Sequence, residues 1–205
     1  MRVTEKISTK TLGRVAYPAT LAAMRDFNAR RDSSTEDELW LLEHPPVYTL
    51  GLAADRAHAP RVANGIPVIE TERGGEITYH GPGQLVVYTL VDLARRGLKV
   101  KRFVWLLEQA VIDLLGGRGQ RRPGAPGIYM EGAKVAALGI RVSRGCAYHG
   151  LSLNVDMDLA PFAAIDPCGY PGLAVTQTRD LGFDFSVETA GKRLAILLTG
   201  HFENA

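Results

Sequence analysis

Short runs of branched and aromatic residues, interrupted by glycine and proline clusters, restrict this chain to a fold built around a β-sheet. Six such runs are predicted strands, at residues 38–45, 46–51, 66–71, 83–93, 133–145 and 146–158. Apolar residues at helical spacing predict three helices, at residues 17–31, 101–117 and 186–202. Strands outnumber helices and do not alternate regularly with them. The pattern therefore predicts an α+β fold, with a sheet and helices packed on one side of it.

The composition favours one domain, residues 1–205. A length of 205 residues with 46% hydrophobic residues can bury a substantial core, and no repeat or long polar linker divides the chain. The N-terminus carries charges where a signal peptide has an apolar block, and no run approaches the ~18 apolar residues of a membrane span. We therefore expect a soluble, cytoplasmic protein with no membrane partner.

Charge gives a weaker indication of partners. The net charge of +2 is too small to imply nucleic-acid binding, so no nucleic-acid partner is expected. Basic residues cluster at 94–102 and at 116–124. Two solvated surfaces explain these clusters most simply, and a docking surface for an acidic partner is the alternative.

One lysine falls on the apolar face of a predicted strand. Within residues 133–145, Lys134 alternates in the same row as Ala136, Leu138 and Ile140, so its ammonium group is expected to be partly desolvated. Burial disfavours the charged form of a lysine and makes it a candidate base or proton shuttle. Alternatively, Lys134 lies at the start of the strand and extends its ammonium group to water.

A glycine-rich segment, residues 71–84, holds Tyr79 and His80 between two predicted strands. Gly74 and Gly75 permit a ligand to approach the backbone closely, although a long hairpin with two tight turns also explains them. The spacing matches neither a Walker A loop nor a GxGxxG fingerprint. His80 is a candidate for catalysis, for positioning a carbonyl group, or for holding the loop by hydrogen bonds.

Cys168 lies on a turn framed by prolines and glycines within residues 167–172. Such a turn leaves room for a reacting carbonyl group and for backbone N–H donors to its oxyanion. A reactive thiol also needs a base or a positive charge nearby, and Lys134 is the candidate. The alternative is a cysteine that merely fills a loop. Cys146 begins a predicted strand and is interpreted as structural.

Three long blocks, residues 73–93, 124–159 and 162–182, together resemble the octanoyl-acyl carrier protein:protein N-octanoyltransferases, also called lipoyl(octanoyl) transferases. The motifs occur in the order expected for that family, and the resemblance covers residues 40–182. It implies a fold like that of biotin and lipoate protein ligases. In that fold a mixed β-sheet is flanked by helices, and the acyl chain lies in a cleft beside the glycine-rich turn.

The resemblance also implies the site residues. By match to the family motifs, Cys168 is expected to carry the acyl group and Lys134 to be its proton-transfer partner. The residues expected to line the substrate site are Arg73, Gly74, Gly75, Glu76, Ile77, Thr78, Tyr79, His80, Ala137, Leu138, Gly139, Gly150, Leu151 and Ser152. Glycine backbone can lie against methylene groups, each of which contributes ~0.8 kcal/mol when buried.

The implied reaction moves an octanoyl or lipoyl group from acyl carrier protein to a lysine of a lipoyl domain or of the glycine-cleavage H protein. Cys168 attacks the donor thioester while Lys134 takes the thiol proton, and the acceptor amine then attacks the acyl-Cys168 thioester. No cofactor is needed. No metal is expected either, because a zinc site formed by His80, Cys146, His149 and Cys168 lacks CxxC or HExxH spacing.

Three other activities fit parts of this sequence. An ATP-dependent lipoate or biotin ligase needs a lysine but no nucleophilic cysteine. A cysteine hydrolase would use water as acceptor, with His80 or His149 as its base. A non-catalytic acyl-binding or carrier-docking protein would have no need of Cys168 and Lys134 together, so this pair favours the transferase.

Overall fold

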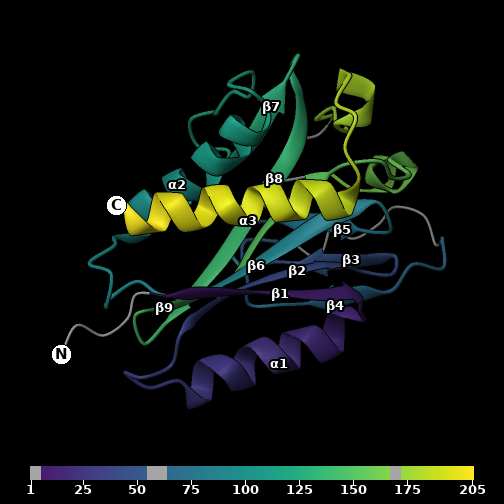
Figure 1. Cartoon of the computed structure of the whole chain (residues 1–205). Helices are drawn as coiled ribbons and strands as arrows, with labels where there is room; N and C mark the ends of the chain where they lie inside the picture. The colour runs from purple at the N-terminus through teal and green to yellow at the C-terminus, as the bar shows by residue number, and fades with distance from the viewer. Residues whose placement is uncertain (1–5, 55–63, 167–171) are drawn as a thin grey trace.

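The computed structural model of the chain describes residues 6–54, 64–166 and 172–205 (Figure 1). The main sheet has the order β1-β2-β6-β9-β8-β7, and a smaller sheet has the order β4-β3-β5. The main-sheet strands are β1 (Ile7–Arg14), β2 (Asp37–Glu43), β6 (Gln84–Asp92), β7 (Gly127–Met130), β8 (Ala133–Ser143) and β9 (Cys146–Asn154). The smaller sheet contains β3 (Val47–Leu50), β4 (Val68–Glu70) and β5 (Ile77–His80). The helices are α1 (Tyr17–Arg30), α2 (Val100–Leu114) and α3 (Val187–Glu203), with 3₁₀ turns at Ala160–Ala164 and Arg179–Leu181.

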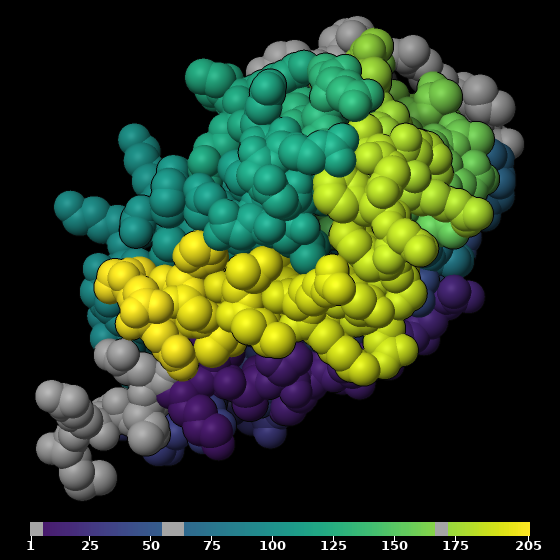
Figure 2. Space-filling view, turned by 45° about the horizontal axis from the view of Figure 1, so that its top comes forward, coloured from purple at the N-terminus to yellow at the C-terminus, as the bar shows by residue number. Residues whose placement is uncertain are grey.

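The main sheet has helices on both faces (Figure 1). Side chains alternate along β2, so that Leu39 and Leu41 pack with α2 and α3, whereas Trp40 and Leu42 pack with α1. Figure 2 shows α3, in yellow, along one face of the molecule between teal residues and the purple N-terminal residues. The expectation of helices on one side only is therefore wrong. A strand covered on both faces reads as a continuous apolar run, which does not show where the covering helices lie.

Both sheets are mixed, as predicted. β1 runs parallel to β2 and β4 parallel to β3, whereas the other neighbouring strands are antiparallel. Each predicted strand and helix corresponds to an element of the fold, and inspection of the sequence missed β1, β5 and β7. β1 is an edge strand with mostly exposed side chains, and β5 and β7 have four residues each. No helix in the described part of the chain is long and apolar enough to cross a membrane.

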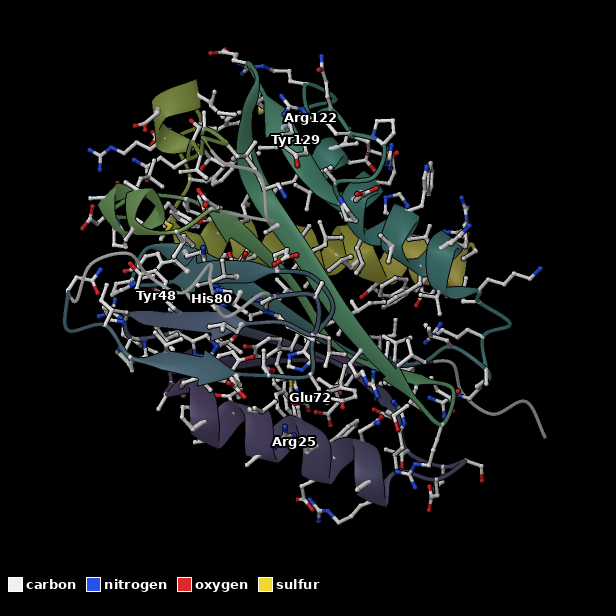
Figure 3. The ribbon with its side chains drawn as sticks, turned by 180° about the vertical axis from the view of Figure 1, so that it is seen from behind. Arg25, Tyr48, Glu72, His80, Arg122 and Tyr129 are labelled. Carbon is white, nitrogen blue, oxygen red and sulfur yellow. The ribbon has the colours of Figure 1, made fainter. Side chains whose placement is uncertain are left out.

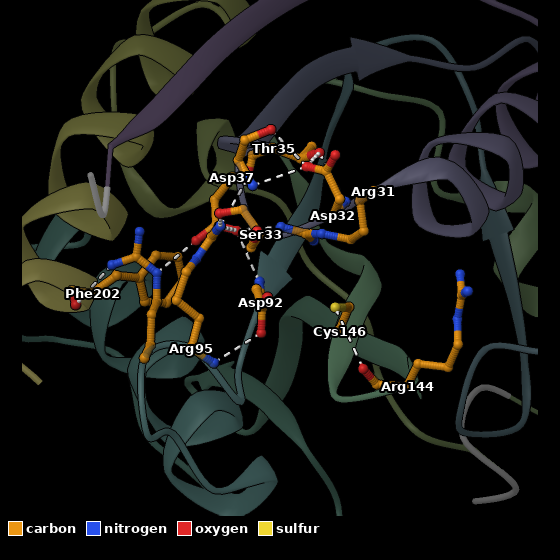
Figure 4. Close-up of polar contacts among 12 residues, drawn as sticks. Arg31, Asp32, Ser33, Thr35, Asp37, Asp92, Arg95, Arg144, Cys146 and Phe202 are labelled. Atoms are coloured by element: carbon orange, nitrogen blue, oxygen red, sulfur yellow. Dashed lines mark hydrogen bonds and ion pairs between the residues drawn. The ribbon is translucent and has the colours of Figure 1, made fainter. Parts of the chain in front are cut away.

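The buried carboxylate of Asp37 accepts hydrogen bonds from three arginines (Figure 4). Its Oδ1 accepts hydrogen bonds from Arg31 at 2.6 Å and Arg95 at 2.7 Å, and its Oδ2 accepts one from Arg96 at 2.7 Å. Burial by itself would raise the pKa of Asp37, but the hydrogen bonds from the Asp92 backbone N–H, Arg96 and Arg31 lower it below the ordinary value of 3.8. The interpretation of residues 94–102 as a solvated surface is therefore wrong for Arg95 and Arg96, which neutralise a buried charge.

Candidate active site

A pocket of about 50 Å³ lies between the glycine-rich segment, β5 and the centre of the main sheet. Of the fourteen predicted substrate-site residues, all but Gly74 and Tyr79 line it, namely Arg73, Gly75, Glu76, Ile77, Thr78, His80, Ala137, Leu138, Gly139, Gly150, Leu151 and Ser152. The structure therefore brings together three predicted segments that are far apart in the sequence. Substrate binding by these residues stays a prediction.

Glycine lets the glycine-rich segment cross the main sheet at close range. The backbone N–H of Gly74 donates to the carbonyl of Ile140 at 2.9 Å. A Cβ on Gly139 would lie only 2.7 Å from the carbonyl oxygen of Gly74. Gly75 has a φ of 87°, which other residues rarely adopt. Gly74 itself lines a neighbouring cavity that shares Gly75 with the pocket.

Arg73 holds the glycine-rich segment in place over the main sheet by hydrogen bonds. Its Nη2 donates to the carbonyl oxygens of Thr49 at 2.6 Å and of Glu76 at 2.7 Å, and its Nε donates to Thr49 Oγ1 at 3.1 Å. The side chain is buried and also lines the pocket. Arg73 therefore joins β3 to the glycine-rich segment and holds that segment in position beside the pocket.

Tyr79 faces away from the pocket. Its ring packs against Tyr48 and Phe162, with centroids 5.5 Å and 5.4 Å away. Alternation along β5 places Thr78 and His80 on the opposite side, where both line the pocket. Tyr79 thus supports the pocket from the core of the smaller sheet.

Lys134 lies at one end of the pocket and is only 3% exposed. Its Nζ donates to the carbonyl of Pro126 at 3.1 Å and lies 5.1 Å from the centre of the Tyr129 ring. A narrow cavity of about 10 Å³ adjoins both Lys134 and the pocket, because Thr78 and Ser152 line both spaces. The alternative in which the ammonium group extends to water is therefore wrong.

The burial of Lys134 is as expected, but the strand alternation that predicted it is interrupted. Ile128 of β7 pairs with Ala136, whereas the next residue, Tyr129, pairs with Lys134, so β8 contains one extra residue. Such a bulge reverses the side-chain faces on its two sides. Lys134 lines the narrow cavity together with the pocket residue Ser152, whereas Val135 and Ala136 pack in the core with α2 and α3, and Ala136 also borders that cavity.

Cys168 lies outside the described residues, so its partnership with Lys134 stays a prediction. The chain that follows it runs beside Lys134: the backbone N–H of Lys134 donates to the Ala174 carbonyl at 2.8 Å, and that of Thr176 donates to the Lys134 carbonyl at 3.0 Å. On the preceding side, Asp166 is buried. The chain is thus packed against the fold on both sides of the undescribed segment. On the C-terminal side, Ala174 and Thr176 hydrogen-bond directly to the backbone of Lys134.

Two buried histidines, His80 and His149, line the pocket, and a third, His44, packs against His80 with ring centroids 5.8 Å apart. His80 is held by a 2.6 Å hydrogen bond with Gln84 Oε1, and His44 by a 2.7 Å hydrogen bond with the Tyr88 hydroxyl. Burial lowers the pKa of His80 and of His149 to about 3 and that of His44 to about 4. All three rings are therefore neutral at pH 7. For His80, the contacts match the alternative of a histidine that holds the loop by hydrogen bonds.

An ion pair borders the site beside α1 (Figure 3). Arg25 donates to Glu72 Oε1 at 2.7 Å, and the Tyr148 hydroxyl donates to the same oxygen at 3.2 Å. Burial by itself would raise the pKa of Glu72, but the hydrogen bond from Arg25, a backbone hydrogen bond and the charge of Arg25 together outweigh burial, and the pKa is about 2. Sequence inspection did not single out the nearby pocket residues Tyr17 and Tyr88, because aromatic side chains in apolar segments look like ordinary core.

Comparison with known proteins identifies the family. A family model described as the lipoyl protein ligase A/B catalytic domain matches residues 17–196. Octanoyltransferases from Thiobacillus denitrificans and Dechloromonas aromatica are 62% and 55% identical, over 90% and 91% of this chain and 86% and 92% of theirs. A crystal structure of lipoate-protein ligase A bound with ATP has a TM-score of 0.80 at 15% identity, and covers 97% of this chain and 86% of that chain. Biotin protein ligase from Aquifex aeolicus, in complex with biotin and ATP, has a TM-score of 0.63 at 11% identity, over 96% of this chain and 71% of its own.

At such low identity the structural likeness establishes the fold alone, which is that of lipoate and biotin protein ligases, as expected. By the extent of the family match, the chain belongs to the lipoyl protein ligase A/B catalytic domain family. Its resemblance to the octanoyltransferases, drawn from three blocks of sequence, is confirmed by the relatives of that name.

Proposed function

We propose that this protein transfers an octanoyl group from acyl carrier protein to a lysine of a lipoyl domain or of the H protein, through a thioester on Cys168. Relatives that are 51–62% identical are named octanoyltransferases. The observation that carries the proposal is the burial of Lys134 in a narrow cavity beside a pocket that is lined by glycine backbone and by both apolar and polar side chains. Such a lysine can exchange protons with reacting groups in a site that is shielded from bulk water.

In the first half-reaction, the Cys168 thiol gives its proton to the Lys134 amine as its sulfur attacks the octanoyl carbonyl carbon. The bond from that carbon to the carrier sulfur then breaks, and the proton passes from Lys134 to the departing carrier thiolate. The Pro126 carbonyl at 3.1 Å and the Tyr129 ring can hold the ammonium group that forms on Lys134 in between. Splitting the transfer in this way is ordinary covalent catalysis.

In the second half-reaction, the neutral ε-amine of the acceptor lysine attacks the acyl-Cys168 carbonyl. A C–N bond forms, the C–S bond breaks, and the proton lost by the amine returns through Lys134 to the Cys168 sulfur. A thioester is thereby converted into a more stable amide. The reaction therefore needs neither nucleotide nor metal.

The donor carrier would dock on the surface that contains Arg122. The Arg122 guanidinium lies 4.2 Å from the centre of the Tyr129 ring, the same ring that Lys134 approaches (Figure 3). Arg122 also lines an open cavity of about 440 Å³ together with Gly172 and Ala174, which follow Cys168 in the sequence. Acyl carrier proteins are typically acidic, so a cationic rim here would orient the acyl arm toward Lys134.

Transfer between purified proteins tests the proposal. The protein should move octanoyl from acyl carrier protein to a lipoyl-domain lysine in EDTA without nucleotide. Transfer that instead requires free octanoate, ATP and magnesium would make the protein an adenylating ligase. Release of free octanoate without an acceptor protein would make it a hydrolase.

A further inference from the structure

The backbone of β9 departs from regular strand geometry at His149, where φ is +61°. Its neighbours Ala147 and Leu151 pack in the core beneath α2 and α3, where Leu151 also borders the pocket, and regular alternation would place His149 in that core too. Instead, the imidazole ring stacks on Tyr148, with centroids 5.0 Å apart, and meets Tyr88 edge-on at 6.0 Å. Both tyrosines belong to the opposite, α1-facing cluster. The left-handed backbone thus turns this side chain out of the core and into the pocket.

This placement is unfavourable for the folded protein in two respects. A residue with a Cβ is strained in the left-handed region. In addition, His149 is only 1% exposed, yet neither ring nitrogen has a hydrogen-bond partner among the residues that the structure describes. His44 and His80, by contrast, are both held by hydrogen bonds to neighbouring side chains. Strain combined with unsatisfied polar atoms points to a functional requirement at this position.

His149 lies at the end of the pocket remote from Lys134. In the pairing of β8 with β9, His149 is opposite Ile140, whereas Lys134 precedes Ala136 at the other end of β8. The pocket lining between them contains Gly139, which allows a chain to lie flat against the sheet. An acyl group whose carbonyl is held beside Lys134 therefore extends its methyl end toward His149.

We propose that His149 determines acyl chain length by forming a polar end wall, which the methyl end of an eight-carbon chain reaches but does not cover. The inference rests on the proposed function. Each further methylene gains free energy by leaving water. A longer chain, however, would press apolar atoms against the imidazole nitrogens, which have no hydrogen-bond partner among the described residues, and would keep them from gaining one. Once the chain extends past His149, the free-energy cost of the unsatisfied imidazole nitrogens offsets the gain from burying another methylene.

Three substitutions separate polarity from bulk at this position. H149G suits the left-handed backbone and removes the wall, whereas H149L replaces it with an apolar side chain. H149N tolerates the left-handed backbone and keeps hydrogen-bonding atoms. The measured quantity is the ratio of kcat/KM for decanoyl- to octanoyl-acyl carrier protein within each variant, because loss of folded enzyme cancels in this ratio. His44, which is buried but does not line the pocket, supplies the matched control variant H44N.

The ratio should rise about tenfold or more in H149G and H149L, the scale of one to two methylenes in an apolar pocket, and stay within about twofold of wild type in H149N and H44N. Wild-type protein that transfers neither chain would remove the proposed function itself. Octanoyl transfer by wild type with unchanged ratios in H149G and H149L would overturn the inference alone. A rise in H149G without a rise in H149L would also overturn it, because bulk and not polarity would then set the limit.

Discussion

Gly127 and Lys134 lie so close that no side chain fits between them. A Cβ on Gly127 would be 3.0 Å from Lys134 Cε and 2.7 Å from the carbonyl oxygen of Ala136. The φ of Gly127, 136°, is also rare for other residues. The position of the Lys134 amine therefore depends on glycine at 127 as well as on the bulge in β8.

Replacing Gly127 by alanine should displace the Lys134 side chain and lower the transfer rate by at least about tenfold, because misplacing a catalytic group by a fraction of an ångström is costly. Single-turnover rates at a temperature where circular dichroism shows both proteins folded would measure this. Gly117→Ala is the matched control, since Gly117 has a φ of 80° but a Cβ added there would meet no atom within 4 Å. Equal rates in the two variants would show that this contact does not position Lys134.

Lys134→Ala should lower octanoyl transfer by at least ~10²-fold, the usual scale for loss of an acid–base group. Lys134→Arg should also fail, because arginine does not release its proton and its larger head must fit beside a cavity of only about 10 Å³. Steady-state transfer to a lipoyl domain measures both variants. Lys192→Ala removes an exposed lysine that pairs with Glu188 and serves as the control. Near-normal rates in either Lys134 variant would rule out its role.

Arg122→Glu should raise the KM for octanoyl-acyl carrier protein at low salt, with less effect on octanoyl-CoA, because only the carrier presents an extended acidic surface. Arg121 is less suitable for this test, since it already pairs with Glu108 at 3.0 Å. Arg30→Glu, on the exposed side of α1, is the control for charge reversal in general. If both donors respond equally, or neither responds, Arg122 is only part of a solvated surface.

Because three histidines are buried in the neutral form, we expect the free energy of unfolding to fall in mild acid. His44, His80 and His149 have a pKa of about 3 to 4 in the folded protein and an ordinary value of 6.5 when unfolded. As the pH falls below 6.5, protons bind the unfolded chain first. The free energy of unfolding should then fall by up to ~1.4 kcal/mol per pH unit for each histidine until the folded pKa is reached. Urea titrations at several pH values would measure this slope, and equal stability at neutral and mildly acid pH would contradict neutral burial.

Apolar periodicity, a local signal, was sufficient to predict the three helices and six of the nine strands that the structure describes. The family motifs pointed to twelve of the sixteen residues that line the pocket. Features that depend on a single backbone distortion could not be predicted from the sequence. The bulge next to Lys134, which lines the cavity that adjoins the pocket, arises from the register between β7 and β8. The φ of His149 likewise leaves no mark on the residue pattern. Arg95 looks like any surface arginine until the fold brings Asp37 to it.

In the proposed mechanism, one of the two cysteines carries the acyl group. Cys146 is a poor candidate, because it is buried and its burial raises the pKa of its thiol. Cys146→Ser should therefore still form an adduct with octanoyl-acyl carrier protein, whereas Cys168→Ser should not.

Intact-protein mass, recorded after mixing with octanoyl-acyl carrier protein in the absence of acceptor, tests this claim most directly. One added octanoyl group is expected on the wild-type protein and on Cys146→Ser, removable by hydroxylamine as a thioester is, and none is expected on Cys168→Ser. Robust transfer to a lipoyl domain by Cys168→Ser, or an adduct that resists hydroxylamine, would contradict it.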